Sequence, residues 1–161
     1  MLLQALAVFR LKSFSCFFLC SLCCIHFPAY AIDVAGVKIP DSICINHGNS
    51  LQLNGAGVRR KVFTDIYVAA LYLEERSSNA NDIIYSETAK RIALHFVYKE
   101  VPVEKLIEGW YDGFVLNNDP QQLKIMQSRL RQSYDYFATM KSGDVIYLDY
   151  IPGKGTRLSI N

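Results

Sequence analysis

The residues best suited to binding chemistry are three consecutive cations, Arg59, Arg60 and Lys61. They follow a glycine-rich turn at 54–57 and precede an apolar and aromatic run at 62–73. Positive charge at the mouth of an apolar element suits an amphiphilic ligand, with an anion at one end and an apolar body beyond it. The alternative interpretation is a β-hairpin whose basic turn is only solvated.

The sequence contains no residue pattern typical of a metal site, a cofactor site or a catalytic nucleophile. His47, His95 and Cys44 lack the spacing of metal ligands, so we expect no metal and no cofactor. The glycines at 54–57 lack the third glycine and the helix of a dinucleotide loop, and those at 153–155 lack the phosphate-loop pattern. No serine stands in a nucleophile elbow. Cys44 lies between two isoleucines, which predicts a core position; the alternative is a catalytic thiol with His47 as its base.

The acidic residues also suggest no reaction. Asp65 and Asp149 fall within expected strands, and we interpret each as an unpaired surface carboxylate. Glu100, Glu104 and Lys105 flank a helix start, where carboxylates are stabilised by the helix dipole. From the residues alone we therefore assign no catalytic group.

Residues 1–31 have the features of a cleavable secretory signal. Arg10 and Lys12 are their only charged residues, and they precede an apolar stretch at 14–27, shorter than the roughly 20 residues of a spanning helix. Ala29-Tyr30-Ala31 supplies a small-x-small cleavage pattern, so we expect a cut after Ala31 and a periplasmic or secreted protein. An N-terminal membrane anchor is the alternative.

Cleavage would change the charge and the cysteine count. The sequence has 17 Lys plus Arg and 15 Asp plus Glu, and two of the basic residues lie before the cut, which leaves 15 of each sign. A neutral protein argues against nucleic acid or a polyanionic surface as its main partner. Four of the five cysteines also precede the cut, so Cys44 alone remains and no internal disulfide is expected. The remaining residues, 32–161, are enough for one domain with its own core.

The pattern along this domain predicts an α+β fold. Alternating or continuous apolar runs predict strands at 32–39, 42–45, 51–56, 62–73, 91–98, 145–151 and 156–160. Capping residues and helical stripes predict helices at 80–86, 102–116 and 120–141, the last ended by Lys141-Ser142-Gly143. The run at 62–73 is expected to be a central strand covered on both faces. The order predicts an antiparallel sheet with helices packed on one face.

Several short segments together resemble the chalcone isomerase family, and specifically its exported bacterial branch. They are Leu53-Asn54-Gly55-Ala56-Gly57-Val58-Arg59, Ile66-Tyr67-Val68-Ala69-Ala70-Leu71-Tyr72-Leu73, Lys90-Arg91-Ile92-Ala93-Leu94, Lys141-Ser142-Gly143-Asp144 and Gly153-Lys154-Gly155-Thr156-Arg157. The resemblance spans about 33–161 and implies an open-faced β-sandwich, an antiparallel sheet backed by helices with a ligand cleft between them. Because the chain stops at Asn161 inside an expected strand, we also consider a C-terminal truncation of a longer protein.

The resemblance implies one retained residue of the isomerase site. Its arginine, which stabilises the substrate anion, corresponds to Arg59, but Tyr67 stands where the family has a threonine. The positions of the catalytic tyrosine and of a substrate-binding asparagine correspond to Pro102 and Gly109, which cannot replace them. Fatty-acid-binding relatives hold a carboxylate with an arginine and a tyrosine, and Arg59 and Tyr67 fit those roles.

We therefore expect a non-catalytic member that binds a small amphiphilic anion, such as a fatty acid, through Arg59 and Tyr67. We expect no nucleic acid partner and no stable membrane insertion after signal cleavage. One alternative is an intramolecular lyase or isomerase acting on a chalcone-like enone. Another is an envelope interaction module without a small ligand, in which Arg59 pairs with a carboxylate such as Asp65.

Overall fold

A six-stranded antiparallel sheet forms the centre of the protein. The computed structural model describes residues 31–45 and 49–161. The strands are β1 (Ala31–Val34), β2 (Val37–Pro40), β3 (Ser42–Ile45), β4 (Asn49–Lys61), β5 (Thr64–Leu73), β6 (Lys90–Phe96), β7 (Glu100–Val101), β8 (Met140–Lys141), β9 (Val145–Ile151) and β10 (Gly155–Ile160). The helices are α1 (Ala80–Tyr85), α2 (Val103–Asn117) and α3 (Pro120–Tyr134). The main sheet has the order β10-β9-β6-β5-β4-β3, and β1-β2 and β7-β8 form two small ribbons.

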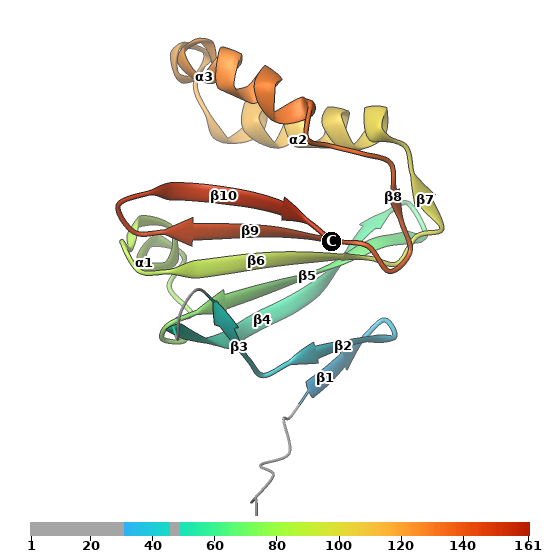
Figure 1. The fold of residues 1–161 in the computed structure, drawn as a ribbon, viewed down its shortest axis with the longest axis vertical. Helices are drawn as coiled ribbons and strands as arrows, with labels where there is room; N and C mark the ends of the chain where they lie inside the picture. The colour runs from blue at the N-terminus through green and yellow to red at the C-terminus, as the bar shows by residue number, and fades with distance from the viewer. Residues whose placement is uncertain (1–30, 46–48) are drawn as a thin grey trace, which may run out of the picture.

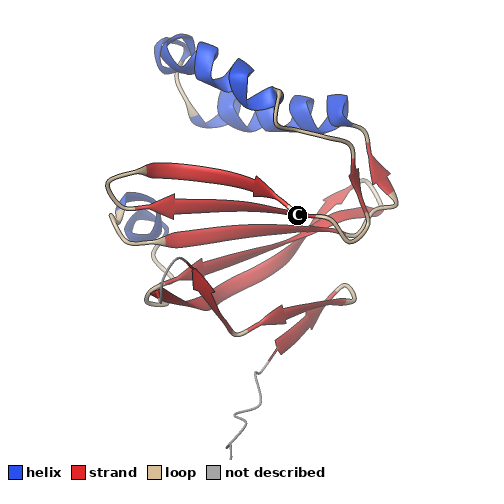
Figure 2. Cartoon of the chain, viewed as in Figure 1, coloured by secondary structure: helices blue, strands red, loops and turns tan. Residues whose placement is uncertain are grey.

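The layers agree with the expected fold. Figure 2 shows the α2–α3 pair and the β1–β2 hairpin on opposite sides of the main sheet. The sheet is antiparallel throughout, and the two long helices, α2 and α3, lie together on one side of it (Figure 1). The α+β class and the open-faced arrangement are confirmed. The predicted signal segment lies outside the described residues except for Ala31, as does His47, so the export and thiol–histidine interpretations stay untested.

The long β4–β5 hairpin differs from the prediction at its tip. The expected strand at 62–73 begins only at Thr64, because Lys61 pairs with Thr64 and leaves Val62 and Phe63 as a two-residue turn. Pairing continues down to Gln52 and Leu73, with register irregularities between Leu53 and Gly55 and between Arg59 and Arg60. Such irregularities add local twist, and they change which residues share a face.

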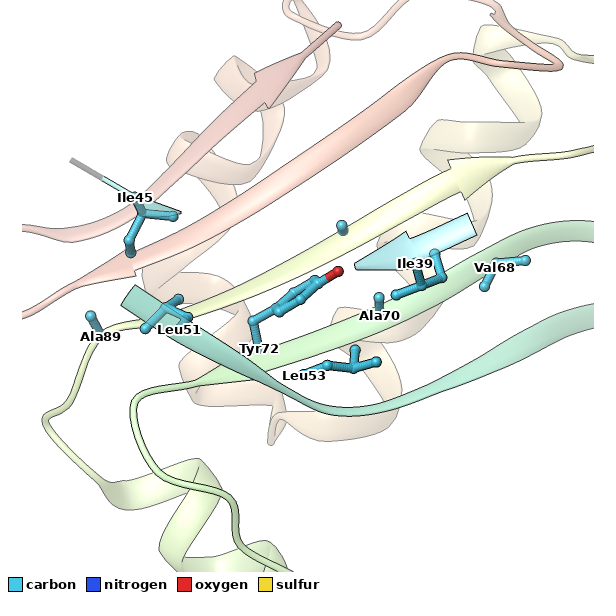
Figure 3. Packing of buried hydrophobic residues seen from close by; sticks show 9 residues of the cluster. Ile39, Ile45, Leu51, Leu53, Val68, Ala70, Tyr72 and Ala89 are labelled. Atoms are coloured by element: carbon cyan, nitrogen blue, oxygen red, sulfur yellow. The ribbon is translucent and has the colours of Figure 1, made fainter. Parts of the chain in front are cut away.

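The N-terminal hairpin covers one face of the sheet. The expected strand at 32–39 is two strands, because Ala35 and Gly36 adopt φ values of 51° and 80° and Gly36 N donates to Asp33 Oδ1 at 3.0 Å. The hairpin brings Ile39 onto the sheet, where its side chain is fully buried. The hydroxyl of Tyr72 donates to the carbonyl oxygen of Pro40 at 3.1 Å. Figure 3 shows Tyr72 among the apolar side chains of this sealed cluster.

The two long helices are joined by a well-defined cap. Asp119 accepts hydrogen bonds from the backbone of Gln121 and Gln122, and the side chain of Gln122 accepts from the backbone of Asp119, which forms a capping box. The prediction for the helix end was wrong: α3 stops at Tyr134, not at Lys141. The chain leaves the helix early because Met140–Lys141 must pair with Glu100–Val101.

Candidate functional site

The two faces of the main sheet are buried to different extents. Along β5, Val68, Ala70 and Tyr72 are buried on the face toward the N-terminal hairpin. The residues that alternate with them, Tyr67, Ala69 and Leu71, point to the helix side and remain half-buried. The strand is apolar on both faces, as predicted, but only the residues that face the N-terminal hairpin, from Val68 to Tyr72, are fully buried.

The incomplete cover arises because the helices pack against one part of the sheet. Their apolar side chains join Phe96, Phe137, Met140 and Ile146 in a second cluster, near β6, β8 and β9. None of the described residues of α2 is fully buried, although Leu106, Ile107 and Trp110 belong to this cluster. The helix layer therefore leaves apolar surface on its own stripe and on the sheet below.

The helix-side face of β4 is open. An added Cβ at Gly55 or Gly57 would meet no heavy atom within 4 Å, apart from its chain neighbours. In register, Gly57 pairs with Ala69 and Gly55 with Leu71, and Leu71 pairs in turn with Ile92. We call these residues (Gly55, Gly57, Ala69, Leu71 and Ile92) the open strip. The open strip contains only small or apolar residues, and the most exposed of its large side chains, Ile92, is 38% exposed.

Arg59 and Tyr67 stand together at one end of the open strip. They are direct cross-strand partners, so their side chains lie on the same face, as do Gly57 and Ala69 two residues further along. Arg59 is exposed, whereas Tyr67 is half-buried and packs on Phe96 with 5.5 Å between ring centroids. Within the described chain, neither side chain makes a hydrogen bond or an ion pair. The guanidinium and the phenol are thus available to the same ligand.

The neighbouring charges have partners of their own. Arg60 Nε donates to Asp65 Oδ1 at 2.6 Å, and this hydrogen bond lowers the pKa of Asp65. The expected pairing of Arg59 with Asp65 is therefore wrong, and so is the interpretation of Asp65 as unpaired. On α2, Lys105 donates to Glu108 at 2.5 Å and lowers the pKa of Glu108. The charge of Lys61 lowers this pKa further.

A hollow of about 400 Å³ continues the same face beyond the other end of the open strip. Lys90, Ile92, Leu148, Tyr150 and Thr156 line it from the sheet, and the α1 region supplies Ile84, Tyr85, Ser86 and Glu87. A second hollow, of about 390 Å³, lies between α2 and α3 and includes Ile107, Tyr111, Leu130 and Tyr134. Neither hollow is lined by Arg59 or Tyr67. The two predicted site residues therefore lie on an open face, not in an enclosed cavity.

The other predicted carboxylate is structural, but it is not on the surface. Asp149 has no exposed area and pairs in register with Arg91 on one side and Arg157 on the other. It accepts from Arg91 at 2.5 and 2.9 Å and from Arg157 at 2.7 Å. Burial raises the pKa of Asp149, but the two arginines more than offset this, and the pKa falls below its usual value. Arg91 also lies over the ring of Tyr147.

His95 and Cys44 show no sign of chemistry. His95 lies on the opposite face from Phe96, as predicted, and partial burial lowers its pKa. Cys44 was expected in the core, but it is exposed, because β3 is an edge strand of the sheet. Among the described residues, no three potential ligands gather at a metal site. The expectation of no metal stays a prediction.

A family model and a solved structure are similar to this chain. A family model described as chalcone isomerase-like matches residues 31–161. The chain belongs to the chalcone isomerase-like family. A crystal structure of a fatty-acid binding protein from Arabidopsis thaliana is similar, with a TM-score of 0.61, 15% sequence identity, and coverage of 81% of this chain and 78% of that chain. No curated protein matches the sequence.

Two positions that the resemblance assigns to the family's catalytic site carry no polar side chain in this chain. Pro102, at the position that corresponds to the catalytic tyrosine, is the N-terminal cap residue of α2 and has no hydrogen-bonding side chain. Gly109, at the position of the asparagine, has no side chain and lies beside open space. Sequence reasoning did not identify the open strip. The signal for it was available: two glycines two residues apart in one strand mark a close approach by another group.

Proposed function

We propose that this chalcone isomerase-like protein binds a single-chain amphiphilic carboxylate, such as a fatty acid, between the sheet and the helices. The observation that carries the proposal is the half-exposed apolar row on the helix side of β5, beside two strand glycines that nothing covers. Contiguous apolar surface of this kind is a feature of ligand-binding grooves. The carboxylate would lie at Arg59 and Tyr67, and the chain would follow the open strip.

The dimensions suit an extended chain. From Arg59 to Gly55 the strand advances four residues, which is about 13 Å at roughly 3.3 Å per residue. The hollow beside Ile92 prolongs this path toward α1. A guanidinium offers a planar pair of donors to a carboxylate, and the phenol adds one more. Hydrogen bonds to a charged group contribute about 1.5–3 kcal/mol each, and apolar burial supplies about 25 cal/mol per Å².

The Arabidopsis neighbour supports the ligand class without establishing it. Its name records fatty-acid binding, and its fold is the one described for this chain. Low sequence identity limits the comparison to the fold, so the site rests on Arg59, Tyr67 and the open strip. Cyclisation of a chalcone-like enone is disfavoured because Pro102 and Gly109 lack the necessary side chains.

Native mass spectrometry of protein purified from cells tests the proposal. The wild type should carry a fatty acid, and Arg59→Ala should lose it. Tyr67→Phe should weaken binding less, because it removes one donor while the ring keeps its contact with Phe96. Arg129→Ala is the matched control, since Arg129 is an exposed arginine on α3. Failure of the wild type to bind any fatty acid, carried or added, would refute the proposal.

We also propose that the protein is exported and cleaved after Ala31. The support is the charge and apolar pattern of residues 1–31, followed by a family match that begins at residue 31. In the described part of the chain, no helix is long and apolar enough to span a bilayer. N-terminal sequencing of the protein from an extracytoplasmic fraction should begin at Ile32, and retention of Met1 in that fraction would contradict cleavage.

A further inference from the structure

The tip of the β4–β5 hairpin exposes two large apolar side chains. The exposed fraction is 79% for Val62 and 93% for Phe63. They form the whole two-residue turn, between the paired residues Lys61 and Thr64. Neither belongs to either apolar cluster of the protein. Folding therefore gives no reason for these side chains to be apolar.

The backbone of this turn makes the choice of residue more unusual. Val62 has φ 58°, in the left-handed region where a β-branched side chain is strained. A two-residue hairpin turn with positive φ at its first position normally places glycine there. Val62 thus retains a strained conformation while its side chain contacts mainly solvent. Strain that the fold does not need is a reason to look for a function.

Cations surround the apolar tip. Lys61 precedes it directly and is exposed, and Arg60 stands one residue further back. The next turn along the same end of the sheet adds Tyr98, which is 43% exposed, and the exposed Lys99. The backbone N–H groups of Val97 and Tyr98 hold this turn against β5, because both donate to the carbonyl of Ile66. In Figure 1 the β4–β5 turn, β7 and β8 all lie at this end of the molecule.

Acidic groups at this end do not cancel the positive charge. Asp65 is paired with Arg60, and Glu108 with Lys105. Glu100 stands next to Lys99, Asp144 accepts from the backbone N–H of Lys141, and Glu104 is exposed at the start of α2. The excess of positive charge therefore lies on the hairpin tip itself, where residues 59–65 hold three cations and one carboxylate.

We infer that this tip docks onto an anionic lipid surface, with Val62 and Phe63 entering the headgroup region and the cations contacting lipid phosphates. An apolar side chain flanked by Lys and Arg is the pattern of interfacial membrane binding. A specific protein partner would need about 800 Å² of this surface, which a two-residue tip does not provide. Docking does not depend on the proposed ligand, although it would bring the Arg59 end of the open strip to the membrane.

Co-sedimentation with vesicles tests the inference. The purified protein should bind vesicles of equal parts phosphatidylcholine and phosphatidylglycerol, and bind pure phosphatidylcholine much less. Phe63→Ser should weaken binding by about tenfold or more, and Lys61→Gln by about fivefold, the value of one cation near such a surface. Because every variant carries the same N-terminal segment, differences among them report on the tip.

Matched controls share the chemistry but not the position. Tyr136→Ser removes an aromatic side chain that is 74% exposed, and Lys124→Gln removes an exposed cation of α3. Both should bind vesicles as the wild type does. In Phe63→Trp, the emission of the new tryptophan should shift to the blue with anionic vesicles, above the signal of Trp110.

Three results would overturn the inference. The first is equal vesicle binding by the wild type and Phe63→Ser, when thermal unfolding curves show that both proteins are folded. The second is binding that does not depend on phosphatidylglycerol. The third is self-association that requires Phe63, seen by size-exclusion chromatography, in a protein that does not bind vesicles. That result would show that the tip contacts a second copy of the chain.

Discussion

Replacement of Gly57 by leucine separates ligand binding from folding. Gly57 lies on the helix side of β4, between Arg59 and Gly55, and an added Cβ would meet open space. A leucine at this position should therefore fit the apo protein without displacing a neighbour. If the ligand follows the open strip, the same leucine would occupy its path.

The leucine should lower the affinity for the ligand but raise the stability of the protein. A leucine would displace about four methylene groups of the ligand at about 0.8 kcal/mol each, which is about 3 kcal/mol or roughly 100-fold in Kd. Gly57→Ala displaces about one group and should cost about fourfold. Meanwhile, removal of a glycine from a strand interior should raise the free energy of unfolding by about 0.5–1 kcal/mol.

Displacement of a fluorescent fatty acid measures the affinity, and urea unfolding of the ligand-free protein measures the stability. Ser50→Leu is the control, because Ser50 is exposed on the same strand but pairs with Cys44 on the edge strand. It should leave the affinity unchanged. A folded Gly57→Leu protein with wild-type affinity would show that the ligand does not lie on this strip.

Two further predictions concern the fold around the site. Asp149→Asn should lower the free energy of unfolding by about 3 kcal/mol at neutral pH, because it leaves Arg91 without its buried counter-charge, a shift of about 1–2 M in the urea midpoint. The folded-state pKa of Asp149 is lowered, so the stability that its charge contributes is complete above the unfolded pKa of about 3.9 and is lost as the pH falls through the folded value. The urea midpoints of the wild type and Asp149→Asn should therefore converge below about pH 4. A difference between the midpoints that stays constant with pH would contradict this. Val62→Gly should raise the free energy of unfolding, measured in urea, by about 0.5–1 kcal/mol. The reason is that relief of about 1–2 kcal/mol of left-handed backbone strain exceeds the entropy cost of glycine. A destabilised variant would show that the turn is not strained.

Local patterns in the sequence predicted most elements of the fold. β9 occupies 145–151 as expected, and the alternation along β6 places Ile92, Leu94 and Phe96 on one face. Helix α3 starts at its Asp119-Pro120 signal. These elements were predictable because each depends on its own apolar period and capping residues.

The elements that depend on distant pairing were not predictable. The end of α3 was wrong because pairing of β8 with β7, across about 40 residues of chain, outweighs the helical stripe that continues to Phe137. Asp149 looked like a surface carboxylate because its two arginines come from β6 and β10, and only the strand order places all three in one row. A single strand's pattern contains no information about its neighbours.

The candidate site divides in the same way. Arg59 and Tyr67 stood out by residue type, but their partnership depends on a two-residue turn and on the irregularity at Arg60, which together set the register. Had the apolar run paired from Val62, as the sequence suggested, Arg59 would not face Tyr67. The site is therefore a property of register, which the residues alone leave open.

The run at 62–73 shows why such a sequence is ambiguous about function. A strand with apolar residues on both faces predicts cover on both faces, and this prediction treats all cover as protein. In this structure the N-terminal hairpin seals one face, and the helices leave Ala69 and Leu71 only half-buried on the other. The apolar residues on the open side are in excess of what the protein's own packing uses, and an apolar ligand would complete their cover. The same reasoning applies at the tip, where Val62 and Phe63 extend the run beyond the sheet and a lipid surface would supply the missing cover.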